Sequence, residues 1–285
     1  MRKTLEQSYC DYKTFISSEK PFIGHVAIEV FKLKNLFLQV FDVFNVGKTK
    51  QELRAEIWRR MEELKIARFP GAFGRIPNFV GAEKAASMLT QLREWKKAQV
   101  IKVNPDSPQA PVRKLALMSN IVLIMPTPRL RNGFLLLEPA KIDKKDYGFA
   151  STIRGAFIYG REIKPEDLPR IDLVVVGSVA VNEQGERIGK GGGYSELEWA
   201  IAREFKKVDE ETPIITTIHD VQFIKDVFEI APYDLPMDYV ITPSKALRIQ
   251  KTREKPKGVY WELISLEKVS EIPILLEMYR SRKAG

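Results

Sequence analysis

RIGKGGGY, residues 187–194, places four glycines and two cations shortly after the apolar run Leu173–Val176. Glycine permits positive φ angles and lets backbone N–H groups approach an anion, while Arg187 and Lys190 supply positive charge. Apolar residues at helical spacing follow at 195–205, so the stretch leads into a helix N-terminus, where unpaired N–H groups favour phosphate. The pattern predicts a phosphate-binding loop between a strand and a helix.

Two common phosphate-binding motifs do not fit this loop. Walker A needs four residues between its first glycine and Gly-Lys-Ser/Thr, but only three separate Gly185 from Gly189, and Gly191 follows Lys190. The dinucleotide motif G-x-G-x-x-G does not match the glycine spacing either, and no well-placed acidic strand end follows. A plain glycine-rich connection is the structural alternative to a phosphate site.

Composition limits the classes of protein to consider. The 285 residues are 44% hydrophobic, which suffices for a buried core in one large α/β domain or two. The single cysteine, Cys10, excludes a disulfide framework and a Cys-based zinc cluster, and suits a reducing compartment. No signal-peptide pattern opens the chain, and charged residues interrupt the apolar-rich segment 21–46. We therefore expect a cytoplasmic protein that does not enter a membrane.

The chain is basic, with a formal net charge of +9. Its cations are scattered rather than gathered in one patch, and most are expected on solvated helix faces. An anionic small-molecule substrate accounts for local positive charge as well as nucleic acid does. The sequence favours small-molecule substrates, leaves a nucleic-acid partner open, and does not distinguish a monomer from a homodimer.

Helical and strand patterns alternate along the chain. Helices are predicted at 48–64, 82–96, 112–119 and 195–205, and strands at 100–103, 121–125, 173–176, 214–217 and 239–241. This alternation predicts an α/β fold with three layers, α/β/α, and a mostly parallel central sheet. Ligands of such sheets bind at the carboxyl ends of strands, where the proline-rich loop 104–111 and the glycine loop would emerge.

Several separated motifs occur in the order and spacing of one family. The segments are Lys50-x-x-Leu53-Arg54, IDLVVV at 171–176, RIGKGGGY at 187–194, HDVQ at 219–222, YDLPMD at 233–238 and ITP at 241–243. Together they resemble the ATP-dependent 5-formyltetrahydrofolate cyclo-ligases, also called methenyltetrahydrofolate synthetases, over roughly residues 48–245. The resemblance implies a cyclo-ligase-like fold related to the NagB/RpiA/CoA transferase proteins. It also implies one domain at 48–285, preceded by an N-terminal extension at 1–47.

The resemblance implies an enzyme that forms a C–N bond. ATP would phosphorylate the formyl oxygen of 5-formyltetrahydrofolate, N10 would close onto the activated carbon, and phosphate would leave to give 5,10-methenyltetrahydrofolate. ATP and Mg²⁺ are the implied cofactors, because the charge on a transferring phosphoryl group must be neutralised by cations and backbone N–H donors. A reduced folate and ATP are the implied small-molecule partners.

The resemblance also implies residue roles. Lys50 and Arg54 would contact ATP phosphates, together with a nucleotide loop of Arg187, Gly189, Lys190, Gly191, Gly192, Gly193 and Tyr194. The catalytic residues would be Lys190, Arg187 and Tyr194. The folate-binding residues would be Glu83, Lys190 and Tyr194. Glu196 and Asp234 fall where the family places its magnesium carboxylates, and hard oxygen ligands suit that ion.

Simpler explanations stand beside these roles. Lys50 and Arg54 are one helical turn apart, so they could be solvated charges on a polar helix face. Asp234 precedes Leu-Pro as turn acids often do, and the helix dipole alone favours Glu196 in a first helical turn. Tyr194 could serve only to pack the start of its helix against the core.

The chain also departs from the common family pattern. Ser195-Glu196 stands where the family usually has Tyr-Asp, which keeps a carboxylate but lengthens its reach. The segments 104–113 and 126–130 are unlike the common enzymes and resemble the divergent branch called methenyltetrahydrofolate synthetase domain-containing proteins. The alternative function is therefore a non-catalytic nucleotide- or RNA-binding protein that retains the cyclo-ligase fold.

Overall fold

The computed structural model of the chain describes residues 47–250 and 253–284. The predicted N-terminal extension, 1–47, lies outside the described residues except for Gly47 and stays a prediction. Within the described ranges, no helix combines the length and apolar character needed to span a bilayer.

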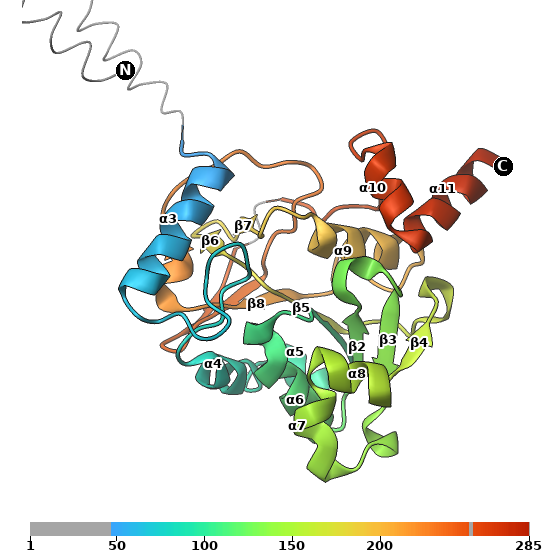
Figure 1. The fold of residues 1–285 in the computed structure, drawn as a ribbon, viewed down its shortest axis with the longest axis horizontal. Helices are drawn as coiled ribbons and strands as arrows, with labels where there is room; N and C mark the ends of the chain where they lie inside the picture. The colour runs from blue at the N-terminus through green and yellow to red at the C-terminus, as the bar shows by residue number, and fades with distance from the viewer. Residues whose placement is uncertain (1–46, 251–252, 285) are drawn as a thin grey trace, which may run out of the picture. The chain divides into compact units, whose positions relative to one another are not determined.

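An eight-stranded sheet forms the centre of the unit Lys48–Gly285, in the order β11-β10-β8-β5-β1-β2-β3-β4 (Figure 1). The strands are β1 Val100–Val103, β2 Val122–Pro126, β3 Phe134–Leu137, β4 Arg161–Ile163, β5 Leu173–Val176, β8 Ile214–Thr217, β10 Tyr239–Ile241 and β11 Ala246–Arg248. Strands β10, β8, β5, β1 and β2 run parallel. The pairs β10–β11, β2–β3 and β3–β4 are antiparallel. The predicted α/β class with a mostly parallel sheet is confirmed.

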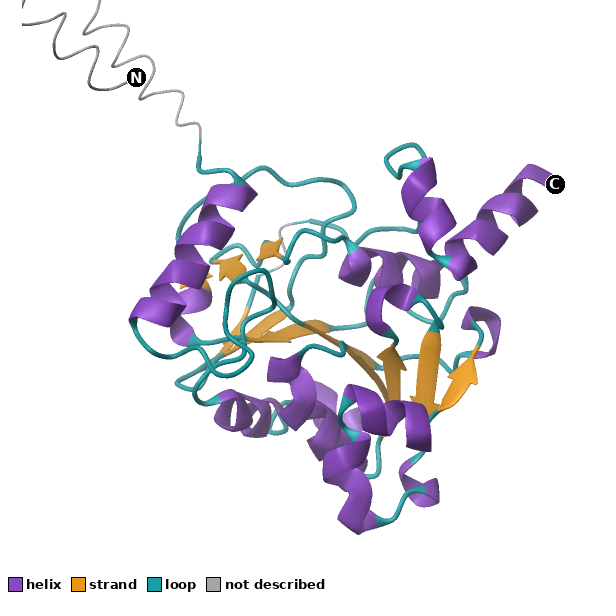
Figure 2. Ribbon diagram, in the orientation of Figure 1, coloured by secondary structure: helices purple, strands orange, loops and turns teal. Residues whose placement is uncertain are grey.

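Helices cover both faces of this sheet (Figure 2). The α-helices are α3 Lys50–Glu63, α4 Ala82–Leu89, α5 Arg93–Lys97, α6 Ala110–Met118, α7 Tyr147–Ala150, α8 Ile153–Tyr159, α9 Tyr194–Glu204, α10 Leu266–Glu271 and α11 Pro273–Ala284. Short 3₁₀ turns lie at Ser107–Gln109, Pro128–Leu130, Pro139–Lys141, Lys144–Asp146, Pro165–Asp167 and Asp220–Gln222.

Alternation along the buried strands divides the core in two. Leu173 and Val175 of β5 pack in the core that includes residues of α4 and α6, whereas Val174 and Val176 pack in the core that includes α9 and α11. Successive side chains of a strand point to opposite faces, so an uninterrupted apolar strand serves both layers. This arrangement confirms the predicted three layers.

A second sheet contains the hairpin that precedes the glycine loop. It has three strands in the order β7-β6-β9, with β6 Ala180–Asn182, β7 Arg187–Ile188 and β9 Phe223–Ile224. The sequence predicts that Arg187 and Ile188 belong to the loop, but both residues are buried in strand β7 and pair with β6. The loop therefore begins at Gly189, at the end of a hairpin and not directly after β5.

The helix predicted at 82–96 is also corrected. Two helices, α4 and α5, occupy the region, and residues 90–92 separate them. The Thr90 hydroxyl donates to the Ser87 carbonyl at 2.7 Å, and Leu92 adopts extended backbone angles. Side chains such as threonine compete in this way with the helical hydrogen-bond ladder.

Candidate active site

A cleft of about 950 Å³ opens at the carboxyl ends of β1 and β2. The loops after these strands line it at 104–107 and 127–129, and the glycine loop lines it at 189–193. The start of α3 and the turn that holds Asp234 also line it. The large cleft therefore lies where a ligand is expected in such a fold, at the carboxyl ends of parallel strands.

Helix α3 brings two cations to the cleft. Thr49 and Glu52 form a capping box that fixes the helix start immediately before Lys50. Arg54, one turn further on, donates from Nε to the Gly189 carbonyl oxygen at 2.7 Å. Burial and the neighbouring charge of Arg187 lower the pKa of Arg54. Arg54 and Arg187 both line the cleft, and the positive charge of such a pair favours an anionic ligand.

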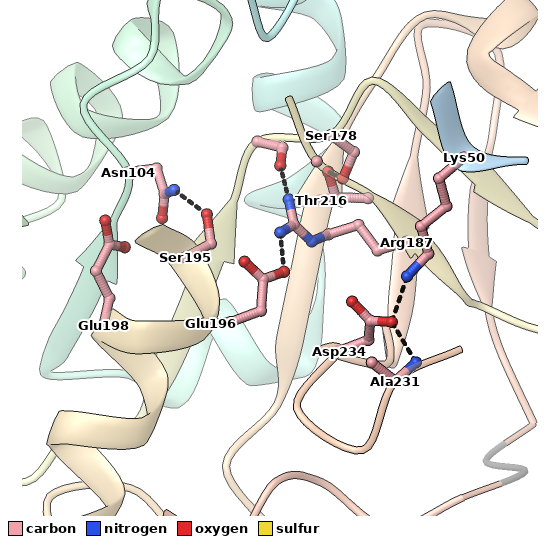
Figure 3. A network of polar contacts seen from close by, with 12 residues as sticks. Lys50, Asn104, Ser178, Arg187, Ser195, Glu196, Glu198, Thr216, Ala231 and Asp234 are labelled. Atoms are coloured by element: carbon pink, nitrogen blue, oxygen red, sulfur yellow. Dashed lines mark hydrogen bonds and ion pairs between the residues drawn. The ribbon is translucent and has the colours of Figure 1, made fainter. Parts of the chain in front are cut away.

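Arg187 lines the cleft and belongs to a network of polar contacts there (Figure 3). Its side chain donates to the Gly177 carbonyl and pairs with the Glu196 carboxylate. Arg187 is only 3% exposed, and its buried Nε has no hydrogen-bond partner among the described residues. A buried donor without a partner costs roughly 1–3 kcal/mol.

The glycine loop has the backbone geometry that its sequence indicated. Gly191 and Gly193 adopt φ angles of +101° and +69°, in the left-handed region that strains other residues. Gly193 is the N-cap of α9, so the loop does lead into a helix N-terminus as predicted. Lys190 is half-exposed, with Nζ 3.8 Å from Oδ1 of Asp106. This lysine is free to meet a ligand in the cleft.

The first residue of α9, Tyr194, lines the cleft and meets a residue that the sequence analysis missed. Lys268 of α10 has its Nζ 3.8 Å from the centre of the Tyr194 ring. Such a contact is a cation–π interaction. No motif in the C-terminal segment indicated Lys268, and only the approach of α10 to α9 places it here.

Both predicted magnesium carboxylates line the cleft, and each contacts a cation. Glu196 pairs with Arg187, and Asp234 pairs with Lys50 while accepting the Ala231 N–H at 2.7 Å (Figure 3). Within the described ranges, no three His, Cys, Asp or Glu side chains group closely enough to hold a metal ion. Mg²⁺ commonly uses one or two carboxylates together with substrate phosphates. The pair fits an ion that arrives with a nucleotide, not a preformed metal cage.

Glu83 is the one predicted site residue that the structure does not bring to the cleft. It lies in the first turn of α4, is exposed, and pairs with Arg68 at 2.8 Å. The other predicted residues all line the cleft: Lys50, Arg54, Arg187, Gly189, Lys190, Gly191, Gly192, Gly193, Tyr194, Glu196 and Asp234.

The sequence motifs did not indicate a polar cluster of Lys102, Asn104, Ser195 and Glu198, of which the last three line the cleft. Lys102 of β1 pairs with Glu198 of α9, and both side chains are buried. Lys102 also donates to Oδ1 of Asn104 at 2.7 Å, whose amide donates to Ser195 at 2.8 Å. Burial raises the pKa of Glu198, although Lys102 opposes the shift. In the sequence, this cluster is indicated only by the charged Lys102 in an otherwise apolar strand.

Comparison with known proteins gives consistent matches. Residues 46–243 match the 5-formyltetrahydrofolate cyclo-ligase family. Over 245 residues the chain is 40% identical to the methenyltetrahydrofolate synthase domain-containing protein of Bos taurus, with 84% of this chain and 64% of that protein covered. This chain thus spans less than two thirds of that relative's length.

Two more distant matches carry related names. The 5-formyltetrahydrofolate cyclo-ligase of Escherichia coli (strain K12) is 31% identical over 85 residues, which are 30% of this chain and 42% of that protein. The solved structure of Aquifex aeolicus 5,10-methenyltetrahydrofolate synthetase is 22% identical, with a TM-score of 0.45, and covers 72% of this chain and 94% of that one. The family match alone extends over well more than half of the 285 residues. The chain belongs to the 5-formyltetrahydrofolate cyclo-ligase family.

Proposed function

We propose that this cleft converts 5-formyltetrahydrofolate to 5,10-methenyltetrahydrofolate with ATP, releasing ADP and phosphate. Membership of the family supports this substrate class. The observation that carries the proposal is the convergence of Arg54, Arg187 and Lys190 with the glycine loop in one cleft. Fixed cations beside free backbone N–H groups are what a transferring phosphoryl group requires.

The proposed reaction proceeds in two steps, phosphorylation of the formyl oxygen and ring closure by N10. The formyl oxygen attacks the γ-phosphorus of ATP, and the bond to the leaving ADP breaks. N10 then attacks the activated formyl carbon, the C–O bond breaks as phosphate leaves, and N10 loses its proton. Catalysis of such a transfer depends mainly on positioning and on electrostatic stabilisation of the phosphoryl group.

Arg187 and Lys190 have roles that follow from their surroundings. Arg187 is buried and tethered at two points, so it would hold a fixed positive charge under the phosphoryl group. Lys190 is half-exposed and only loosely paired, so it would follow the phosphoryl group between ATP and folate. The amides of Gly191–Gly193 would donate to phosphate oxygens at the start of α9.

Glu196 and Asp234 would hold Mg²⁺ together with nucleotide phosphates. The ion would neutralise phosphate charge. The binding of phosphates near Lys50 and Arg187 would free these carboxylates from their present partners.

The same proposal includes a cytoplasmic location and a single catalytic domain at 48–285. The single cysteine in the sequence supports a reducing compartment. The compact unit Lys48–Gly285 supports one domain.

Incubation of the purified chain with 5-formyltetrahydrofolate, ATP and Mg²⁺ tests the proposed reaction. The near-ultraviolet absorbance of the methenyl product should rise, and the rise should require all three components. A heat-denatured sample is the control. ATP binding without any rise above that control would contradict the proposal and favour the non-catalytic nucleotide-binding alternative.

A further inference from the structure

A second cavity, of about 450 Å³, adjoins the glycine loop. It shares six lining residues with the large cleft, namely Gly191, Gly192, Gly193, Glu196, Tyr233 and Lys268. Its remaining walls come from α9 and from the segment 256–265. That segment lies beyond residue 243, where the match to the family ends. The cavity is therefore built largely by a part of this chain that the family match does not include.

The chemistry of the second cavity differs from that of the cleft. Aliphatic side chains such as Leu197, Val259 and Leu263 line it together with Tyr260. Its few polar groups include Ser265 and Lys268. Ligand pockets are typically concave and mostly apolar with a few polar groups, and this size lies within their usual range.

The wall formed by 256–265 is anchored to the domain. Trp199, buried in α9, donates to the Pro256 carbonyl at 2.8 Å, and the Val259 N–H donates to Glu204 at 3.0 Å. Just before the wall, buried Lys255 donates to the Thr212 carbonyl at 2.7 Å and pairs with Asp238 at 2.8 Å. These contacts hold the wall of the cavity in place, which preorganises it for a ligand.

We propose that the second cavity binds the purine base of the nucleotide whose phosphates contact the glycine loop. This inference rests on ATP being a substrate, as proposed above. Gly191–Gly193 line both the cleft and the second cavity. A nucleotide whose phosphates bind these glycines can therefore place its base in either space. The cleft presents charged groups suited to phosphate and to an anionic co-substrate. The second cavity presents apolar and aromatic surface suited to a planar base.

Calorimetric titration of the full chain with ATP and with inorganic tripolyphosphate, both with Mg²⁺, tests the base site. Leu263 lines the cavity and is 53% exposed, so Leu263→Gln removes apolar contact without disturbing the core. Leu266 is 64% exposed in the neighbouring helix and does not line the cavity, so Leu266→Gln is a matched control.

The wild-type chain should bind ATP at least tenfold more tightly than tripolyphosphate. Leu263→Gln should weaken ATP binding about fivefold or more and leave tripolyphosphate binding within twofold. Leu266→Gln should leave both unchanged. Equal effects of Leu263→Gln on the two ligands, or no effect on either, would overturn the base site.

Turnover separates this inference from the proposed reaction. Folate-dependent turnover, combined with ATP binding that does not depend on Leu263, would overturn only the base site. ATP binding that depends on Leu263, without folate-dependent turnover, would support the base site and overturn only the proposed reaction.

Discussion

Lys50 and Asp234 form a partly buried ion pair at the cleft although 184 residues separate them in the sequence. Lys50 begins α3, and Asp234 lies in a turn closed by its own contact with the Ala231 N–H. The pair joins the first of the family motifs, which begins at Lys50, to the motif YDLPMD at 233–238. It also leaves both charges beside the glycine loop, where a nucleotide could separate them.

A double-mutant cycle with Lys50→Met and Asp234→Asn should detect this pair. We expect a coupling free energy of about 0.5–3 kcal/mol in urea unfolding, because the two side chains touch and are mostly shielded from water. Saturating ATP with Mg²⁺ should reduce the coupling, since phosphates would compete for Lys50. Strictly additive effects in the absence of nucleotide would show that the pair does not stabilise the fold.

Lys190→Ala should abolish most turnover while the protein stays folded. Removal of one group that stabilises charge in a transition state commonly costs about a hundredfold or more in kcat. Lys190 is half-exposed, and among the described residues it has a single, long ion-pair contact, so its loss should leave the unfolding midpoint unchanged. Lys164→Ala, at an exposed position away from the cleft, is the control. Unchanged kcat in Lys190→Ala would remove this lysine from the mechanism.

The central strands and the glycine loop could be predicted because local sequence carries their signals. Leu173–Val176 is a continuous apolar run, and it is a fully buried strand. The left-handed angles at Gly191 and Gly193 explain why the loop needs glycine. Strand β7 could not be predicted, because a two-residue strand at Arg187–Ile188 exists only through its pairing with β6.

The rest of the site depends on contacts between distant segments. Lys102 and Glu198 are 96 residues apart, and nothing local to either residue indicates their pairing. Lys268 reaches Tyr194 only because α10 packs near α9. The folate-binding role predicted for Glu83 rests on similarity alone. Its side chain, in the first turn of α4, pairs with Arg68 instead of lining the cleft.

Glu83→Gln should leave catalysis nearly unchanged, whereas Glu196→Gln should weaken the use of Mg²⁺. Glu83 is exposed and does not line the cleft, so its replacement should leave KM for the folate within about twofold. Glu196 lines the cleft beside Arg187, and loss of its charge should raise the Mg²⁺ concentration for half-maximal activity about tenfold. Steady-state rates across a folate titration would measure the KM, and rates across a Mg²⁺ titration would measure the Mg²⁺ requirement. A large rise in the folate KM of Glu83→Gln would mean that α4 contributes to the folate site after all.

Glu198→Ala should destabilise the fold strongly. Loss of one partner of a buried ion pair leaves an uncompensated charge and costs about 3–5 kcal/mol. The double variant Lys102→Met with Glu198→Leu should recover much of this loss, because it removes both charges. Lys141→Met breaks an exposed pair with Glu138 and should cost less than about 1 kcal/mol. Urea unfolding of the wild type and the three variants would measure these differences. A small loss of unfolding free energy in Glu198→Ala would contradict the buried pairing.

The stability of the fold should fall as the pH drops below about 6.5, the ordinary pKa of histidine. Burial lowers the pKa of His219 in the folded chain, although Asp220 opposes the shift. The unfolded chain therefore binds more protons between the lowered pKa and the ordinary value, so this contribution to stability is present above pH 6.5 and lost as pH falls through that window. Nδ1 of His219 accepts the Val221 N–H at 3.3 Å, and asparagine can replace that acceptor without titrating. The urea midpoint of His219→Asn should therefore change less between pH 7.5 and pH 5.5 than that of the wild type, and equal changes in the two proteins would assign the acid sensitivity to other groups.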